Sequence, residues 1–139
     1  MPYDWKFSAN GNKYQILANS GKTSPDDNNI LDLINVRGKI SSEIRSTIYI
    51  TSDFAKYNSS NQNSNFYQNV VINYEDQQIT CDNFDIDIET NLAIAYNNVI
   101  VTDPKSIMKA GEITFDLETK DININPDSEK SKVKIITEN

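Results

Sequence analysis

Apolar and polar residues alternate with a period of two along much of the chain. The alternation is clear over residues 47–51, 84–89, 113–118 and 121–125, where isoleucine, phenylalanine and leucine are separated by threonine, aspartate, glutamate and asparagine. This pattern is typical of antiparallel strands that bury one face and expose the other. No strong amphipathic helical period is present. The pattern therefore predicts an all-β protein.

Two further apolar runs precede these segments. Residues 13–18 predict a short strand, and residues 19–29 have the proline, glycine, aspartate and asparagine content of a loop. Residues 30–36 could form one or two helical turns, but their β-branched residues and the following Arg37-Gly38 favour a strand.

The centre of the chain repeats itself. Residues 50–53 (ITSD) recur as residues 79–82 (ITCD), 29 residues later, and residues 67–72 recur at the same offset as residues 96–101. A third copy begins at residues 108–111. An internal period of this size indicates stacked units that share one core.

The repeat also predicts where its strands bend. The parity of the inward residues changes once in each unit, near Asp53-Phe54, Asp82-Asn83 and Gly111-Glu112. One extra residue at the same place in every unit is the signature of a β-bulge or corner. Each unit is then a pair of strands bent at a common level. We expect residues 13–137 to form one domain, a tall, twisted antiparallel double sheet with unpaired edge strands, preceded by a flexible segment over residues 1–12.

Composition narrows the chemistry. The 139-residue chain has no histidine, one cysteine and a net charge of −7. The missing histidine removes the commonest general base, and the negative charge argues against a nucleic-acid partner. The acidic string Asp82, Asp85, Asp87 and Glu89 lacks the glycine of a calcium-binding loop and alternates with apolar residues, so it predicts a solvated strand face. We expect a buried, unreactive Cys81, no catalytic residues, no metal site and no cofactor.

Large apolar residues gather on the inward parity of the repeat. They either fill a closed core or line a groove between two incompletely closed sheets, and the sequence leaves both interpretations open. The candidates for such a groove are Ile48, Ile50, Tyr57, Val70, Ile72, Phe84, Ile86, Ile88, Ile94, Tyr96, Val99, Val101, Phe115 and Leu117.

The turn motif in the repeat resembles a known family. It reads Gln68-Asn69-Val70-Val71-Ile72 and Asn97-Asn98-Val99-Ile100-Val101, each followed or preceded by Ile-Thr-x-Asp, as in the OstA-like repeat of bacterial lipopolysaccharide-transport proteins. The N-terminal residues 11–18, the acidic loop and residues 30–33 resemble the membrane-anchored LptC family more than the soluble bridge, LptA. The family usually has glycine where Gln68 and Asn97 stand, and asparagine adopts positive φ more easily than glutamine.

This resemblance implies a fold and a function. The fold would be an OstA-like β-jellyroll, and the protein would accept lipopolysaccharide from an inner-membrane ABC transporter and pass it along a hydrophobic groove to a periplasmic bridge protein. Partners would join by edge-strand pairing, the transporter near Tyr14, Ile16 and Ala18 and the bridge protein near Val133, Ile135 and Thr137. Lys105, Lys109, Lys132 and Lys134 would lie at the groove rim, facing the lipid phosphates.

The resemblance also implies a location. The protein would reside in the periplasm, anchored to the inner membrane by a helix upstream of Pro2. Two other functions remain open from the sequence. One is a structural or adhesion β-repeat domain with no ligand in its core, and the other is an enzyme that relies on carboxylates, which the outward acidic residues and the missing histidine disfavour.

Overall fold

The computed structural model describes residues 3–119 and 121–126, together with the backbone of residues 134–137. These residues form ten β-strands and no helix, which confirms the all-β prediction. The strands are β1 (Tyr3–Ala9), β2 (Asn12–Thr23), β3 (Ile30–Ser42), β4 (Ile48–Asn58), β5 (Ser64–Tyr74), β6 (Gln77–Asp87), β7 (Leu92–Thr102), β8 (Ser106–Asp116), β9 (Ile122–Asn125) and β10 (Lys134–Thr137). None of the described elements is a helix that could span a membrane.

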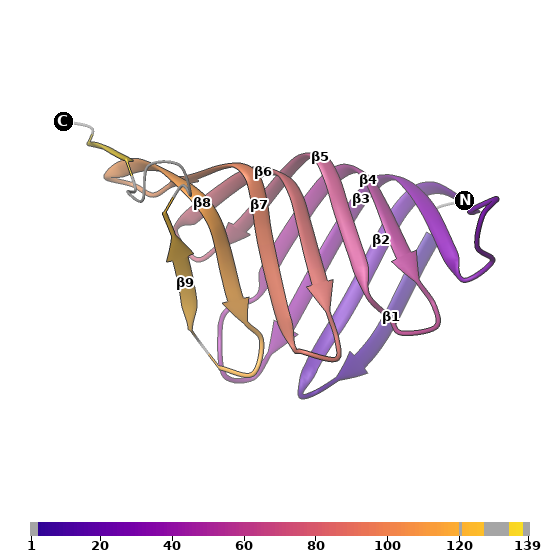
Figure 1. The fold of residues 1–139 in the computed structure, drawn as a ribbon. Helices are drawn as coiled ribbons and strands as arrows, with labels where there is room; N and C mark the ends of the chain where they lie inside the picture. The colour runs from indigo at the N-terminus through magenta and orange to yellow at the C-terminus, as the bar shows by residue number, and fades with distance from the viewer. Residues whose placement is uncertain (1–2, 120, 127–133, 138–139) are drawn as a thin grey trace.

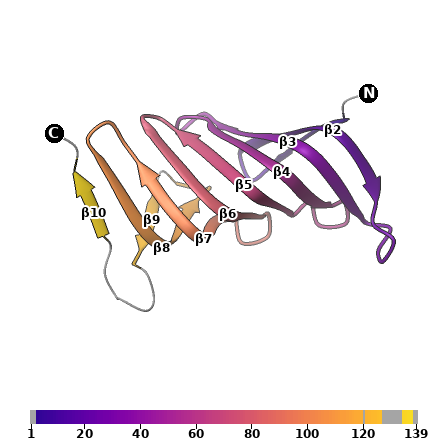
Figure 2. The same cartoon turned by 90° about the horizontal axis from the view of Figure 1, so that it is seen from above.

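The strands form one antiparallel sheet in chain order. Each strand from β1 to β8 pairs with the next, and β9 and β10 both pair with β8. β10 lies beside residues 106–109 and β9 beside residues 112–115, so two short strands share one edge of β8. The strands lie side by side from β1 at the N-terminal end to β8 at the other end of an elongated, twisted molecule (Figures 1 and 2).

The predicted repeat is confirmed at the level of whole strands. β4, β6 and β8 begin at Ile48, Gln77 and Ser106, 29 residues apart, and each contains 11 residues. Short connections join β4 to β5, β5 to β6, β6 to β7 and β7 to β8. The sequence repeat therefore corresponds to a repeated pair of antiparallel strands.

The predicted corner also forms, but the extra residue lies on the other strand of each pair. The register shifts where β5 and β7 pass residues 68–69 and 97–98, and β4, β6 and β8 change burial parity opposite them. Gln68 and Asn97 have φ values of 64° and 66°, so both occupy the left-handed region. The glutamine thus adopts the conformation for which glycine is normally selected.

The bend folds the sheet over itself, so its two halves face each other across the core. Tyr74, at one end of β5, packs edge-to-face on Phe115, at the opposite end of β8, with ring centroids 6.2 Å apart. The ring of Phe84 lies between those of Phe115 and Phe66, with centroids 5.9 Å and 6.3 Å away. Because strand ends from distant parts of the chain meet in this way, the interior is one continuous apolar layer.

The N-terminal segment is part of the sheet, so the prediction of a flexible segment over residues 1–12 is wrong. Residues 3–9 pair with residues 12–18 of β2 in unbroken register. Trp5 stacks on Tyr3 at 5.3 Å, and Phe7 stacks on Tyr14 at 4.8 Å. Alternating aromatic residues give β1 a half-buried face, and the polar residues between them obscured this pattern in the sequence.

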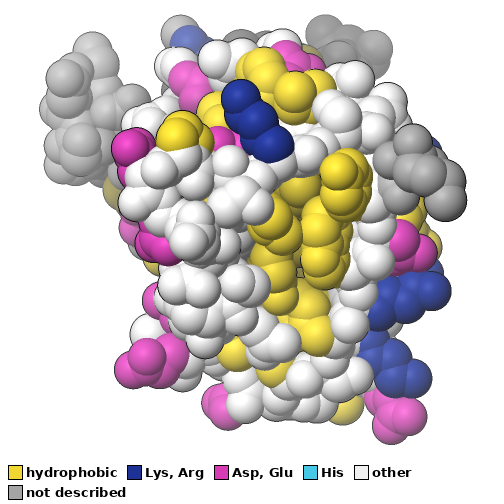
Figure 3. Space-filling view, turned by 90° about the vertical axis from the view of Figure 1, so that its right-hand side faces the viewer, with side chains coloured by type: hydrophobic (Ala, Val, Ile, Leu, Met, Phe, Trp, Pro, Cys, Tyr) yellow, Lys and Arg dark blue, Asp and Glu magenta, His cyan; other side chains and the backbone are white. Residues whose placement is uncertain are grey.

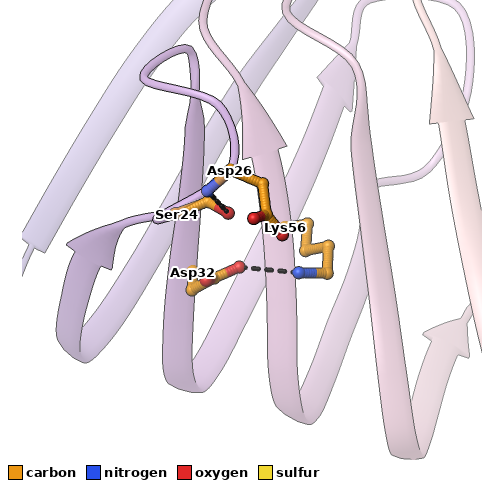
Figure 4. Close-up of polar contacts among 4 residues, drawn as sticks. All are labelled: Ser24, Asp26, Asp32 and Lys56. Atoms are coloured by element: carbon orange, nitrogen blue, oxygen red, sulfur yellow. Dashed lines mark hydrogen bonds and ion pairs between the residues drawn. The ribbon is translucent and has the colours of Figure 1, made fainter.

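Charged residues lie on the outer face and at the loops. Lys56 Nζ is 2.8 Å from Asp32 Oδ1, joining β4 to β3, and the carboxylate raises the pKa of the lysine (Figure 4). In the adjacent loop the backbone N–H of Asp26 donates to Ser24 Oγ at 3.4 Å. These acidic residues therefore take part in local structure.

Candidate functional site

The interior between the two halves of the sheet contains most of the predicted groove residues. Those buried on the inner face are Ile48, Ile50, Tyr57, Val70, Ile72, Phe84, Ile86, Val99, Val101, Phe115 and Leu117. Ile88 is half-buried, because it follows the end of β6. The inward parity of the repeat thus located the interior correctly in these strands, and a binding role for these residues stays a prediction.

Two predicted groove residues lie on the opposite face. On β7 the fully buried residues are Ala93 and Ala95, so Ile94 and Tyr96 point outward. The Tyr96 hydroxyl donates to Asp85 Oδ2 at 3.0 Å on that outer face. The small alanines lie inside because their cross-strand partners include Phe84 and Phe115, whose rings occupy the space. Side-chain size in the sequence was therefore misleading at this strand.

The middle of the interior is filled by protein side chains. Phe66, Phe84 and Ile113 have no exposed surface, and Ile48 and Ile72 are equally buried. Protein cores of this kind have few voids larger than a water molecule. Space for a ligand therefore lies towards the ends of the roll.

The N-terminal end is open and apolar. Figure 3 views the molecule from this end and shows hydrophobic side chains lining a hollow in its centre. Trp5, Phe7 and Leu31, from β1 and β3, are partly buried and pack against the core. A separate pocket of about 320 Å³ lies mainly on the outer face of β1–β3, because six of its lining residues alternate with the core positions: Lys6, Ser8, Lys13, Gln15, Lys39 and Ser41.

A second opening lies near the C-terminal end. A cleft of about 730 Å³ separates the β5–β6 and β7–β8 turns from β9, with Tyr74, Ile122 and Ile124 in its lining. Asp103 in the β7–β8 turn accepts hydrogen bonds from the backbone N–H groups of Lys105 and Ser106, and these bonds lower its pKa. The cleft is apolar on one side and charged on the other.

A half-buried arginine, which the sequence analysis did not identify, lies where strand ends from the two halves of the sheet meet. Arg45 Nη2 donates to Asn12 Oδ1 at 2.5 Å and approaches the backbone oxygen of Leu117 at 3.4 Å. Asn12 Nδ2 donates to the same oxygen at 3.0 Å, and Asn10 Nδ2 donates to the Ile88 oxygen at 3.0 Å. We call these five residues the seam. An arginine in a short loop is usually solvated, so no local signal distinguished this one.

The predicted N-terminal partner edge is wrong. Tyr14, Ile16 and Ala18 lie in β2, which β1 and β3 cover on both sides, and their side chains are buried in the core. The N-terminal edge strand is β1. At the other end, Val133 lies outside the described residues, whereas Ile135 and Thr137 belong to β10, the last strand in the sheet order.

Cys81 is buried, as predicted. Its Sγ lies 3.3 Å from the backbone oxygen of Asn83, and burial raises the pKa of the thiol to about 12. A thiol of this kind is inert at neutral pH because the reactive form is the thiolate. Within the described part of the chain, no group of three or more acidic or cysteine residues could hold a metal ion.

Comparisons with known proteins agree with this geometry. A solved structure of LptH, the LptA-homologous periplasmic component of the lipopolysaccharide transport device of Pseudomonas aeruginosa, superposes with a TM-score of 0.61. The match covers 91% of this chain and 95% of LptH at 8% sequence identity, so it shows a shared fold. No curated protein matches in sequence. The family described as Lipopolysaccharide-assembly, LptC-related matches residues 5–135. The predicted β-jellyroll and the family resemblance are thereby confirmed, and the chain belongs to the LptC-related lipopolysaccharide-assembly family.

Proposed function

We propose that this protein is a periplasmic lipopolysaccharide carrier that accepts its ligand from an inner-membrane ABC transporter and passes it to a periplasmic bridge protein. Membership of the LptC-related family supports a role in lipopolysaccharide transport. The specific steps rest on the structure of the interior, on its openings and on the two edge strands. In this role the protein binds and transfers a lipid and carries out no chemical reaction.

The observation that carries the proposal is the apolar interior with an opening at the N-terminal end. Acyl chains gain about 0.8 kcal/mol for each methylene that leaves water, so a continuous apolar lining holds them without specific polar contacts. Trp5, Phe7 and Leu31 provide that lining at the opening, and the buried residues of β4 to β8 continue it. The polar headgroup of the ligand stays at the edge of this lining, towards water.

The two edge strands provide the contacts with partners. β1 and β10 stand at opposite ends of the sheet order, and each has one side without a partner strand among the described residues. A strand from another protein can pair with such an edge through backbone hydrogen bonds. We assign β1 to the transporter and β10 to the bridge protein, with a membrane anchor upstream of Pro2.

Site-specific photo-crosslinking tests the carrier role. A photo-reactive residue is placed at inward Phe7, Ile86 or Val99, and at outward Asp85 or Asp87 as matched controls on the same strand as Ile86. We expect lipopolysaccharide adducts at the inward positions and none at the controls. Adducts at the outward positions alone would overturn the groove.

The same experiment separates the carrier from a structural repeat domain. Complete burial of Phe66 and Phe84 is the observation that favours a closed core. If the core stays closed, no inward position gives adducts, even at the N-terminal opening. Adducts at Phe7 that extend to Ile86 during transport support a lipid that moves along the interior.

A further inference from the structure

Arg45 of the seam and two residues beside the seam, Tyr14 and Asn91, carry buried polar atoms that lack hydrogen-bond partners. Within the described residues, the buried side-chain nitrogen and oxygen atoms without a partner are Tyr14 Oη, Arg45 Nε, Arg45 Nη1, Asn91 Nδ2 and Asn91 Oδ1. Three residues hold all five atoms. Buried polar groups are nearly always hydrogen-bonded, so several partnerless groups close together indicate a place where a ligand could bind.

Leu117 connects two of these residues, and the third, Tyr14, lies near Arg45. The backbone oxygen of Leu117 accepts hydrogen bonds from Asn12 and Arg45, and its backbone N–H donates to the backbone oxygen of Asn91 at 2.9 Å. Burial raises the pKa of Tyr14, and the nearby positive charge of Arg45 acts in the opposite direction. Arg45, Tyr14 and Asn91 therefore belong to one cluster, although the chain brings them from β2, the β3–β4 loop and the β6–β7 turn.

The charge of Arg45 is also uncompensated. Its guanidinium contacts an amide and a backbone oxygen, and no described carboxylate forms an ion pair with it. Burial lowers its pKa, because the charged form loses hydration. Removing a cation from water without an anionic partner is costly. The donors that remain are two guanidinium nitrogens, a hydroxyl and an amide nitrogen, and such donors suit the oxygens of a phosphate.

The seam occupies the position where a headgroup would lie. Its residues are at strand ends, whereas the sheet bends in the middle of its strands, so the seam joins the free ends of the two halves. Acyl chains that enter at the N-terminal opening and lie between the halves would place their headgroup along this line. The partnerless atoms have almost no accessible surface while the seam is closed, so a ligand reaches them only when the strand ends part.

We propose that Arg45, with Tyr14 and Asn91, forms a binding site for a phosphate monoester on a lipid headgroup, occupied when acyl chains part the seam. The proposal rests on the carrier function above and adds the group that the protein recognises. The closed seam leaves five polar atoms without partners, which lowers the cost of opening. A bound phosphate then supplies the missing acceptors and the missing negative charge.

The test compares two lipids and two arginine variants. The lipids are an acylated glucosamine disaccharide with phosphate monoesters and the same molecule after removal of its phosphates. The variants are Arg45→Gln and Arg37→Gln, the latter altering the chain's other arginine, which is exposed on β3. We expect wild type and Arg37→Gln to bind the phosphorylated lipid about tenfold more tightly than the dephosphorylated one. Arg45→Gln should bind both lipids equally.

Further measurements keep the outcomes distinct. Tyr14→Phe, which removes one hydroxyl, should lose about threefold in affinity for the phosphorylated lipid only, and circular dichroism verifies that each variant is folded. Equal binding of both lipids by wild type overturns the phosphate site and leaves the carrier function intact. Failure of wild type to bind either lipid overturns the carrier function as well. Inorganic phosphate should not raise the melting temperature of wild type, and a rise that Arg45→Gln abolishes would assign the site to the free ion.

Discussion

Asn98 Nδ2 donates a hydrogen bond to Asp82 Oδ2 at 2.6 Å across the bend of the sheet. The preceding repeat has the same bond, from Asn69 Nδ2 to Asp53 Oδ2 at 2.7 Å. In both units the asparagine has positive φ, 57° at Asn98 and 54° at Asn69. The asparagine side chain therefore links the bulge to the preceding strand, and asparagine also tolerates the positive φ at this position.

Replacing Asn98 should separate these two effects. Asn98→Ala loses the hydrogen bond and places alanine in the left-handed region, so we expect a loss of about 1–2 kcal/mol in the free energy of unfolding. Asn98→Gly loses the bond but relaxes the backbone and should cost less. Urea denaturation measures both. Equal losses in the two variants would show that the backbone conformation contributes nothing.

Gly38 is a position where the core admits no side chain. A Cβ there would lie 3.0 Å from Phe66 Cζ and 3.3 Å from Ile50 Cδ1. Because Phe66 is fully buried, its ring cannot move freely, and Gly38→Ala should destabilise the protein by about 1–3 kcal/mol. The double variant Gly38→Ala/Phe66→Leu should recover part of that loss in a thermal melt. A stable single variant would contradict the tight packing at this site.

Cys81 should make stability fall at alkaline pH. Burial raises the pKa of its thiol from 9.0 to about 12, so the folded state favours the protonated form. The stabilising contribution is complete below about pH 9 and is lost as the pH rises towards 12. Between about pH 8.5 and pH 10.5, wild type should lose about 1–2 kcal/mol more than Cys81→Ser, which has no thiol to titrate. Identical slopes in denaturant titrations would show that the thiol is accessible to water.

Trp5 provides a reporter at the N-terminal opening. It is the chain's one tryptophan, half-buried in β1, with its ring 6.2 Å from that of Tyr57. Acyl chains that enter the opening should displace water from the indole and shift its fluorescence to shorter wavelength. The water-soluble oligosaccharide part of the ligand should cause no shift. A shift with the oligosaccharide alone would place the sugar, rather than the acyl chains, at this opening.

Sequence patterns predicted where the strands lie along the chain better than they predicted how the strands pair with one another. The 29-residue repeat located β4, β6 and β8, because a regular sheet repeats its inward residues at equal intervals. The repeat assigned the extra residue at each corner to the wrong strand. The alternation of buried and exposed residues shifts on β4, but the extra residue of the bulge lies on β5. It also missed β1, because seven residues rich in polar side chains form a strand only when β2 is available for pairing.

At the candidate site, too, the sequence predicted what depends on a single strand and failed where neighbouring strands decide. Alternation along single strands correctly predicted that Phe84, Ile86 and Phe115 face the interior. It failed at Ile94, because the choice between an isoleucine and the neighbouring alanines depends on rings from the adjacent strands. Tyr14 was predicted at an exposed edge and lies in the core, since edge position depends on the number of strands that precede it.

The sequence by itself determined the central β-strands, their period and the family of this protein. These features follow from local alternation and from short motifs whose residues are near one another in the chain. Only the tertiary structure decided which strand is the edge, where the interior opens and what closes it. Asn12 and Leu117 are 105 residues apart, and Arg45 comes between them in sequence. No local sequence pattern predicts that these three residues contact one another, because the contact results from the accumulated bend and twist of the whole sheet.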